Sequence, residues 1–284
     1  MNITLLQSNP GDGIFVESAI CLQQSLRLIN IPAQLHINGV DSSGYTIYFG
    51  AGLRCTPDVF QQIADPARSI IFNLEQLESR ATVVDQAYLD LLKNYIVFDY
   101  HSSNVNYLKK SFNKDDAYEI PIVPCLKLIN QKSIFTDVKK TSDFLFYGSI
   151  NSRRSHIIDA LRNKGYRVDV ISDAYGHDLT RHMQATRCII HIHYHESALF
   201  PAIRVLQPTI SGIPVISEKS YFSNFSDWGS SGILFSEYED FVQVCENFLM
   251  DSCARESAVQ KTLALISRID FEYAWKIAQK TLNI

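Results

Sequence analysis

The chain has 284 residues, of which 46% are hydrophobic, enough for one large or two modest cores. Its 26 basic and 30 acidic residues give a formal net charge of −4 at pH 7, which excludes the strongly basic balance of a general nucleic-acid binder. No apolar run approaches the ~18 residues of a membrane span. Residues 1–6 also lack the basic and apolar regions of a signal peptide.

The six cysteines are scattered along the chain, and no pair has the CxxC spacing of a metal or redox motif. Most of them stand among apolar residues, which is typical of reduced, buried thiols. We therefore expect a cytoplasmic protein, with the inner face of the membrane as the alternative location.

Strand and helix patterns alternate through the first part of the chain. Apolar and β-branched runs predict strands at residues 3–7, 33–37, 45–49, 69–73, 95–99 and 120–122. Helical patterns lie between several of them, at residues 15–29, 57–64, 85–92 and 104–111. This alternation predicts a parallel sheet with helices on both faces, as in a Rossmann-type unit.

Polar residues follow three of these strands, where the carboxyl ends of parallel strands form one rim. They are the turn with Gly11 and Gly13, Glu75 in the second group, and Asp99 with His101 in the third. Close backbone approach of a ligand at the glycines, with Glu75, Asp99 or His101 as a general base, is one interpretation. The alternative is an ordinary turn at the glycines and simple helix capping by Asp99.

Residues 126–142 have weak periodicity and several Lys and Ser, which indicates an interdomain connection. Strand and helix patterns then alternate again, with strands at 143–149, 166–171, 188–194, 213–216 and 232–235. Helices are expected at 152–164, 177–186, after residue 201, and at 237–250, 254–269 and 272–282. We therefore predict residues 1–125 and 143–284 as two Rossmann-like domains with parallel sheets facing across a cleft.

Two arginines stand at the start of the helix predicted from residue 152. Arg153 and Arg154 oppose the helix dipole there, and a bound anion would remove that penalty. We expect Gly148 and Asn151, in the preceding turn, to belong to the same phosphate site. The alternative is two solvated arginines on the helix shoulder.

The stretch from Glu196 to Val215 carries a resemblance to a known family. It contains Glu196, Arg204 and the sequence SGIPV ending at Val215. This resembles the donor-binding segment of GT-B glycosyltransferases (glycosyltransferase group 1 and its relatives), where a Glu is followed about eight residues later by a second Glu and then by small-Gly-x-Pro-Val. Two departures are evident, because Arg204 replaces the second Glu and the segment from there to Gly212 is about three residues longer.

The resemblance implies that Glu196 hydrogen-bonds the donor sugar or ribose. Arg204 departs from the family pattern, and we expect it to contact a phosphate or carboxylate of the donor. The alternative is an ion pair between Glu196 and Arg204. The resemblance also implies catalysis without a metal ion, and it leaves the donor and the stereochemistry of transfer open.

Three histidines, His191, His193 and His195, alternate along the predicted strand and so share one face. A metal site, buried hydrogen-bonded rings, and contact with a sugar or phosphate are the three interpretations. His193 and His195, closer to the strand's end, are favoured for a ligand contact.

The segment Tyr107 to Lys114 combines aromatic residues with three lysines. Peripheral contact with an anionic membrane is one interpretation, and a solvated helix face is the other.

Together these patterns predict a glycosyltransferase that uses a nucleotide-sugar donor and a glycan or lipid-linked acceptor, in surface polysaccharide assembly. The donor would bind the second domain and the acceptor the first, with no nucleic-acid partner, no metal and no cofactor besides the nucleotide-sugar substrate. Two alternatives are a metal-dependent hydrolase that uses the histidine face and a non-catalytic protein that binds a sugar or nucleotide.

Overall fold

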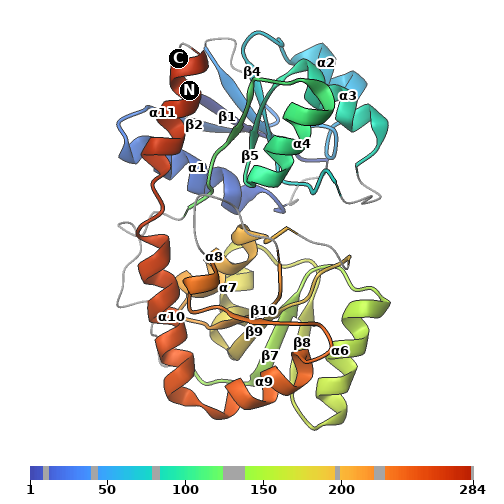
Figure 1. The fold of residues 1–284 in the computed structure, drawn as a ribbon, viewed down its shortest axis with the longest axis vertical. Coiled ribbons are helices and arrows are strands. Elements are labelled where there is room, and N and C mark those ends of the chain that lie inside the picture. The colour runs from blue at the N-terminus through green and yellow to red at the C-terminus, as the bar shows by residue number, and fades with distance from the viewer. Residues whose placement is uncertain are drawn as a thin grey trace. The chain divides into compact units, whose positions relative to one another are not determined.

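Two separate sheets organise the chain in the computed structural model (Figure 1). The structure describes residues 1–8, 13–39, 44–78, 84–123, 138–195, 199–220 and 228–282. The chain divides into a first unit, which contains Met1–Val123 and Asp270–Ile284, and a second unit, which contains Pro124–Phe222 and Ser226–Ile269.

The first unit is built on a sheet with the strand order β2-β1-β3-β4-β5-β6. Every described pairing in it is parallel, as the alternation of strands and helices predicts. The strands are β1 (Asn2–Leu5), β2 (Gln34–Ile37), β3 (Thr46–Phe49), β4 (Ser69–Asn73), β5 (Ile96–Asp99) and β6 (Ala117–Glu119). The helices are α1 (Val16–Leu28), α2 (Pro57–Ile63), α3 (Gln86–Asn94), α4 (Ser102–Phe112) and α11 (Phe271–Leu282).

Aromatic side chains hold helices against both faces of this sheet. Successive residues of β3 point to opposite faces, so Tyr48 meets Phe60 of α2 on one face, with 5.0 Å between ring centroids. On the other face, the ring of Phe98 lies 5.7 Å from that of Trp275 on α11. The C-terminal helix is therefore part of the core of the first unit.

The second unit has a sheet with the strand order β11-β10-β9-β7-β8, again parallel in every described pairing. Its strands are β7 (Ser142–Tyr147), β8 (Val168–Ile171), β9 (Thr186–His191), β10 (Val215–Glu218) and β11 (Leu234–Ser236). Its helices are α6 (Ser152–Asn163), α7 (Gly176–Gln184), α8 (Ala202–Ile210), α9 (Phe241–Met250), α10 (Ser252–Ile266) and the short 3-10 helix η2 (Trp228–Ser230).

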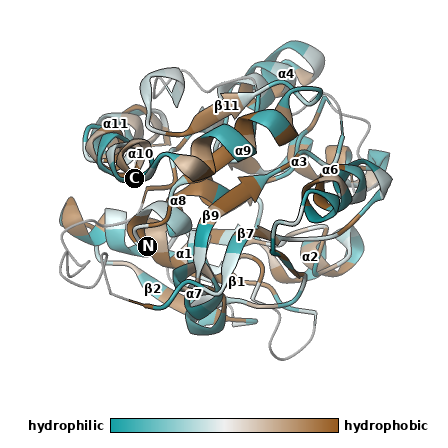
Figure 2. Cartoon of the chain, turned by 90° about the horizontal axis from the view of Figure 1, so that it is seen from below, coloured by the Kyte–Doolittle hydropathy of each residue, from teal (hydrophilic) through white to brown (hydrophobic). Residues whose placement is uncertain are grey.

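The helices of the second unit bury one side only. Along α9, the buried residues Phe241, Cys245 and Phe248 recur at the spacing of one helix face. Figure 2 accordingly shows brown and teal stretches alternating along α9. These residues join Phe144 and Ile190 from the sheet in one apolar core.

Three sequence predictions differ from this structure. The strand predicted at 120–122 is wrong, because the paired strand β6 ends at Glu119. Ile120 and Ile122 are nevertheless buried. The strand predicted at 188–194 ends at His191. The C-terminal helix, predicted to lie in the domain 143–284, packs in the first unit through Trp275. Residues 126–137 of the expected linker lie outside the described residues.

Among the described helices, none is both long enough and apolar enough to cross a membrane. The segment Tyr107 to Lys114 places much of its bulk inward, because Tyr107 and Phe112 pack against the core and Lys114 is buried in an ion pair with Asp116. Fewer apolar groups are therefore left at the surface for the predicted membrane contact.

Trp275→Ala should lower the free energy of unfolding of the first unit by about 3–5 kcal/mol, because it leaves a cavity beside Phe98. Tyr273→Ala, at a position 60% exposed on the same helix, is the control and should change stability by about 0.5 kcal/mol or less. Urea denaturation followed by circular dichroism measures both. Equal effects of the two changes would contradict the packing of α11 described here.

Candidate functional site

The turn between β7 and α6 places a helix N-terminus at the carboxyl edge of the second sheet. Gly148 has φ 125°, a conformation that side chains rarely adopt. Asn151 caps α6 by accepting a hydrogen bond from the Arg154 N–H at 3.0 Å. Asn151 also donates its amide to the Tyr194 carbonyl at 2.8 Å, which ties the turn to the segment after β9.

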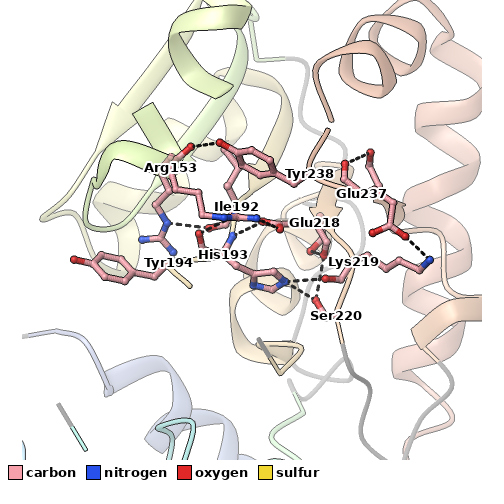
Figure 3. A network of polar contacts seen from close by, with 12 residues as sticks. Arg153, Ile192, His193, Tyr194, Glu218, Lys219, Ser220, Glu237 and Tyr238 are labelled. Atoms are coloured by element: carbon pink, nitrogen blue, oxygen red, sulfur yellow. Dashed lines mark hydrogen bonds and ion pairs between the residues drawn. The ribbon is translucent and has the colours of Figure 1, made fainter. Parts of the chain in front are cut away.

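Arg153 is held from several sides (Figure 3). Both of its terminal nitrogens donate to the carboxylate of Glu218, at the end of β10, and one also donates to the His193 carbonyl at 3.3 Å. The guanidinium lies 3.9 Å from the ring centroid of Tyr238, whose hydroxyl donates to the Arg153 carbonyl at 2.8 Å. The charge of Arg153 is thus offset inside the protein.

Arg154 is only 5% exposed and has a different environment. Its Nε donates to the Ile192 carbonyl at 2.9 Å and its Nη1 to the Ser149 carbonyl at 2.6 Å. Burial is the main cause that lowers the pKa of Arg154 to about 10, and the nearby charge of Arg204 contributes to the same shift. Even so, Arg154 remains a cation at neutral pH.

Arg204 lies on α8, and its side chain reaches the end of β7. Its Nη1 donates to the Tyr147 carbonyl at 3.0 Å, and the Tyr147 hydroxyl donates to the Arg204 carbonyl. A Cβ on Gly148 would lie 2.9 Å from Nη1 of Arg204, so a larger residue at this position would make the guanidinium shift. Glycine at position 148 and arginine at position 204 therefore fit each other.

These arginines give the site an excess of positive charge. Within the described part of the chain, Glu218 pairs with Arg153, while neither Arg154 nor Arg204 forms an ion pair with a carboxylate. The two unpaired cations disfavour each other, as the lowered pKa of Arg154 reflects. An anion between them would replace this repulsion with charge-assisted hydrogen bonds. Glu196, the predicted partner of the donor sugar, lies outside the described residues.

The three histidines do not form a single cluster. His191 and His193 are buried with 5.0 Å between ring centroids, whereas His195 lies beside the ring of Tyr194. His191 contacts the Ser217 hydroxyl at 3.2 Å, and His193 contacts the Ser220 hydroxyl at 2.8 Å. Among the described residues, no group of three or more His, Cys, Asp or Glu side chains is arranged to hold a metal ion.

In the first unit, Asp99 is fully buried at the end of β5. Its carboxylate accepts hydrogen bonds from the Asn73 amide at 2.6 Å, the His101 backbone N–H at 2.8 Å and the Asn104 amide at 3.1 Å. Burial raises the pKa of Asp99 well above its usual value, and the three donors counteract that shift. This geometry supports a role in holding the surrounding loops rather than direct contact with a substrate.

The loop that carries Glu75 is bound to the same network. The Asn73 and Asn104 amides donate to the Glu75 carbonyl at 2.9 and 2.7 Å, and Glu75 itself is partly exposed. His101 is buried and caps α4 by accepting from the Ser103 N–H at 3.1 Å, a role that one of the two sequence-based interpretations gave to Asp99. Of the three candidate bases, Glu75 is the one that the structure leaves within reach of solvent.

The glycine turn of the first unit is described only in part. Gly13 is buried just before α1, and its carbonyl accepts from the Val16 N–H at 3.2 Å. Gly11 lies outside the described residues. The candidate bases Glu75, Asp99 and His101 therefore lie in the first unit, and the arginines lie in the second.

Sequence reasoning missed Glu218 and Tyr238 as parts of the site. Glu218 ends the strand that follows the SGIP turn, and its place at the carboxyl end of a parallel strand was the available signal. Tyr238 follows β11 and had no such signal in the sequence, because only the fold brings it to Arg153.

Comparison with known proteins gave few close relatives in sequence. No protein-family model matches the chain. Two uncharacterized proteins of Acanthamoeba polyphaga mimivirus are similar to it. One is 27% identical over 199 residues, which is 65% of this chain and 26% of that protein. The other is 23% identical over 188 residues, which is 63% of this chain and 59% of that protein. The chain thus matches about a quarter of the first relative and less than two thirds of the second.

Solved structures resemble the chain over its whole length. An alpha-glucosyltransferase in complex with UDP and a DNA that contains an HMU base has a TM-score of 0.67 at 8% identity, with 100% of this chain and 99% of that chain covered. WaaG, a glycosyltransferase involved in lipopolysaccharide biosynthesis, has a TM-score of 0.62 at 11% identity, with 98% and 99% covered. HepE of Anabaena, in complex with UDP and glucose, has a TM-score of 0.60 at 12% identity, with 100% and 99% covered.

These similarities establish the fold. The chain has the GT-B fold, with two Rossmann-like units that each contain a parallel sheet, and the fold predicted from the sequence is confirmed. The structural neighbours are glycosyltransferases, and the complexes named above contain UDP.

Glu218→Gln should lower the free energy of unfolding of the second unit by about 3 kcal/mol, because it leaves the charge of Arg153 without its carboxylate. Glu237→Gln breaks the exposed pair with Lys219 and should cost about 1 kcal/mol or less, which makes it the matched control. Thermal and urea unfolding measure both variants. If Glu218→Gln were as mild as the control, Glu218 would not be the structural partner of Arg153.

Proposed function

We propose that the protein is a glycosyltransferase that takes its sugar from a nucleotide-diphosphate donor bound to the second unit. The observation that carries this proposal is the pair Arg154 and Arg204, two cations without a carboxylate partner among the described residues, at the N-terminus of α6. Helix N-termini and arginine forks are the groups that bind phosphates. Gly148 and Asn151 shape the turn there, and the structural neighbours with this fold include a glycosyltransferase in complex with UDP.

The arrangement also favours the chemistry of transfer. The bond between the anomeric carbon and the donor phosphate breaks, its electron pair stays on the phosphate oxygen, and the acceptor oxygen forms the new bond and loses its proton. Negative charge therefore develops on the leaving diphosphate, and positioned guanidinium groups stabilise it. We propose that Arg154 and Arg204 supply this charge and that transfer needs no metal ion, which retention of activity in EDTA would test.

UDP-sugars are the donor class that the structural neighbours support, because several of their complexes contain UDP. The structural neighbours do not point to one class of acceptor, since WaaG is involved in lipopolysaccharide biosynthesis and the alpha-glucosyltransferase complex contains DNA. We propose a glycan or lipid-linked acceptor for this chain, in surface polysaccharide assembly, because its net charge of −4 disfavours a polyanionic acceptor.

Binding of nucleotides tests the donor site. UDP, GDP, TDP, ADP and CMP are compared by thermal shift and calorimetry, and a ligand at 100 times its dissociation constant adds about 2.7 kcal/mol of stability. We expect one diphosphate to bind and CMP to bind more weakly. Arg204→Gln should weaken binding roughly 10- to 100-fold, because a charge-assisted hydrogen bond is lost.

Arg181→Gln is the matched control for this experiment. Arg181 is an exposed arginine of the same unit that pairs with Asp178 at 3.0 Å, and its loss should leave nucleotide affinity unchanged. Binding of no nucleotide, or equal losses in Arg204→Gln and Arg181→Gln, would contradict the proposed site.

Turnover tests the acceptor side. We propose that Glu75, on the loop held by Asn73 and Asn104, deprotonates the acceptor hydroxyl. Glu75→Gln should therefore lower the rate of sugar transfer by about 100-fold or more and leave donor affinity unchanged. The neighbouring change Glu78→Gln, at an exposed position, is the control. An unchanged rate in Glu75→Gln would show that transfer proceeds without this base.

A further inference from the structure

The hydrogen bonds of His193 determine which ring nitrogen carries its proton. Its Nε2 lies 3.2 Å from the Lys219 carbonyl and 2.8 Å from the Ser220 hydroxyl (Figure 3). A carbonyl oxygen only accepts hydrogen bonds, so Nε2 must carry the hydrogen. The Ser220 hydroxyl donates to the Glu218 carbonyl at 3.1 Å and is therefore free to accept from Nε2. In the neutral ring, Nδ1 then keeps a lone pair, and it has no hydrogen-bond partner among the described residues.

Charged groups surround this ring from three elements. Glu218 of β10 accepts a hydrogen bond from the His193 backbone N–H at 2.9 Å, but its carboxylate is shared with Arg153. Arg153 and Arg154 face His193 from α6, and His191 precedes it along the same segment. Burial lowers the pKa of His193 first, Glu218 opposes that effect, and the two arginines add to it. The ring is therefore neutral at pH 7 while the site holds no anion.

We propose that His193 takes up a proton at Nδ1 when the donor diphosphate binds at Arg154 and Arg204, so that donor binding and protonation of this histidine are coupled. The inference rests on the proposed function. Arg154 is one of the two arginines that disfavour the imidazolium and also one of the two that the diphosphate would contact, so the negative charge would offset the effect of Arg154 on His193. The Nε2–H bonds to Lys219 and Ser220 remain in both states, because protonation adds a hydrogen only at Nδ1.

His191 provides an internal comparison. Its Nδ1 lies 3.2 Å from the Ser217 hydroxyl, which itself donates to the Glu218 carbonyl at 3.0 Å. His191 is fully enclosed, and burial, His193, Arg204 and Arg154 all lower its pKa well below the usual value. We therefore assign the proton to His193 and use His191 as the control.

The coupling has a defined sign. The pKa of His193 is low without donor and higher with donor, so the bound state holds more protons at any pH between the two values. Donor affinity is then highest at low pH and falls as pH rises through this window, by at most about tenfold per pH unit for one proton. Above the pKa of the bound state the affinity becomes independent of pH.

The experiment is titration calorimetry of the full chain with UDP-glucose, and with GDP-mannose as a second probe, in buffers of different ionisation enthalpy. Both phosphates of a nucleotide sugar are diesters, so the probe keeps a constant charge, whereas the terminal phosphate of UDP titrates near neutral pH. The dependence of the binding enthalpy on the buffer gives the number of protons taken up. We expect a value approaching one at the centre of the window for the natural chain.

The variants separate His193 from its neighbours. His193→Gln keeps an amide donor toward Lys219 and Ser220 but does not titrate, so it should still bind and take up no protons. His191→Gln and His195→Gln should keep the uptake of the natural chain. Undiminished uptake in His193→Gln, or uptake lost in His191→Gln alone, would overturn the assignment to His193.

Failure of the inference differs from failure of the proposed function. Binding of a probe to the natural chain without proton uptake would overturn only the inference. Binding of neither probe would overturn both. If His193→Gln does not fold, His193→Asn replaces it, and the uptake measured on the natural chain still decides whether any coupling exists.

Discussion

The ion pair between Arg153 and Glu218 is the interaction on which the second unit's site depends. It joins the first turn of α6 to the end of β10, and the same carboxylate accepts the His193 N–H, so three elements meet at one side chain. A carboxylate that is only 6% exposed is costly to bury alone, and the bidentate arginine offsets that cost. Tyr238 covers the outer face of the guanidinium, which keeps the pair in one geometry. Arg154, the next residue of α6, is held separately by the Ile192 and Ser149 carbonyls.

A consequence of this pairing is that charge is distributed unevenly over the site. Among the described residues, Glu218 pairs with Arg153, whereas no carboxylate forms an ion pair with Arg154 or Arg204 beside the helix N-terminus. The backbone carbonyls of Ile192, Ser149 and Tyr147 satisfy part of their hydrogen-bonding capacity but none of their charge. The proposed donor diphosphate would supply the negative charge that these carbonyls lack, at the edge where the parallel strands end.

The sequence predicts the fold well because periodicity and turn chemistry are local properties. The alternation of apolar strands with helices, and the SGIP turn before β10, led to parallel sheets and to the GT-B fold. The arginines at the start of α6 were also recognisable, since their position opposes the helix dipole. Tyr238 was not recognisable, and Glu218 could be placed at the sheet edge but not paired with Arg153, because residues 153, 218 and 238 meet only after the sheet has formed. The position of α11 could not be predicted for the same reason, since its own sequence does not indicate which sheet Trp275 packs against.

The two units show how one topology can serve opposite charges. In the first unit, Asp99 at the end of β5 is fully buried and its side-chain oxygens accept hydrogen bonds from the Asn73 and Asn104 amides, whereas Glu75 at the same sheet edge is partly exposed. In the second unit, the buried carboxylate of Glu218 pairs with Arg153, and among the described residues Arg154 and Arg204 form no ion pair with a carboxylate. A partly exposed carboxylate suits a hydroxyl acceptor that must lose a proton, whereas such arginines suit an anionic donor. The proposed assignment of the acceptor to the first unit and the donor to the second therefore rests on the side chains at each sheet edge.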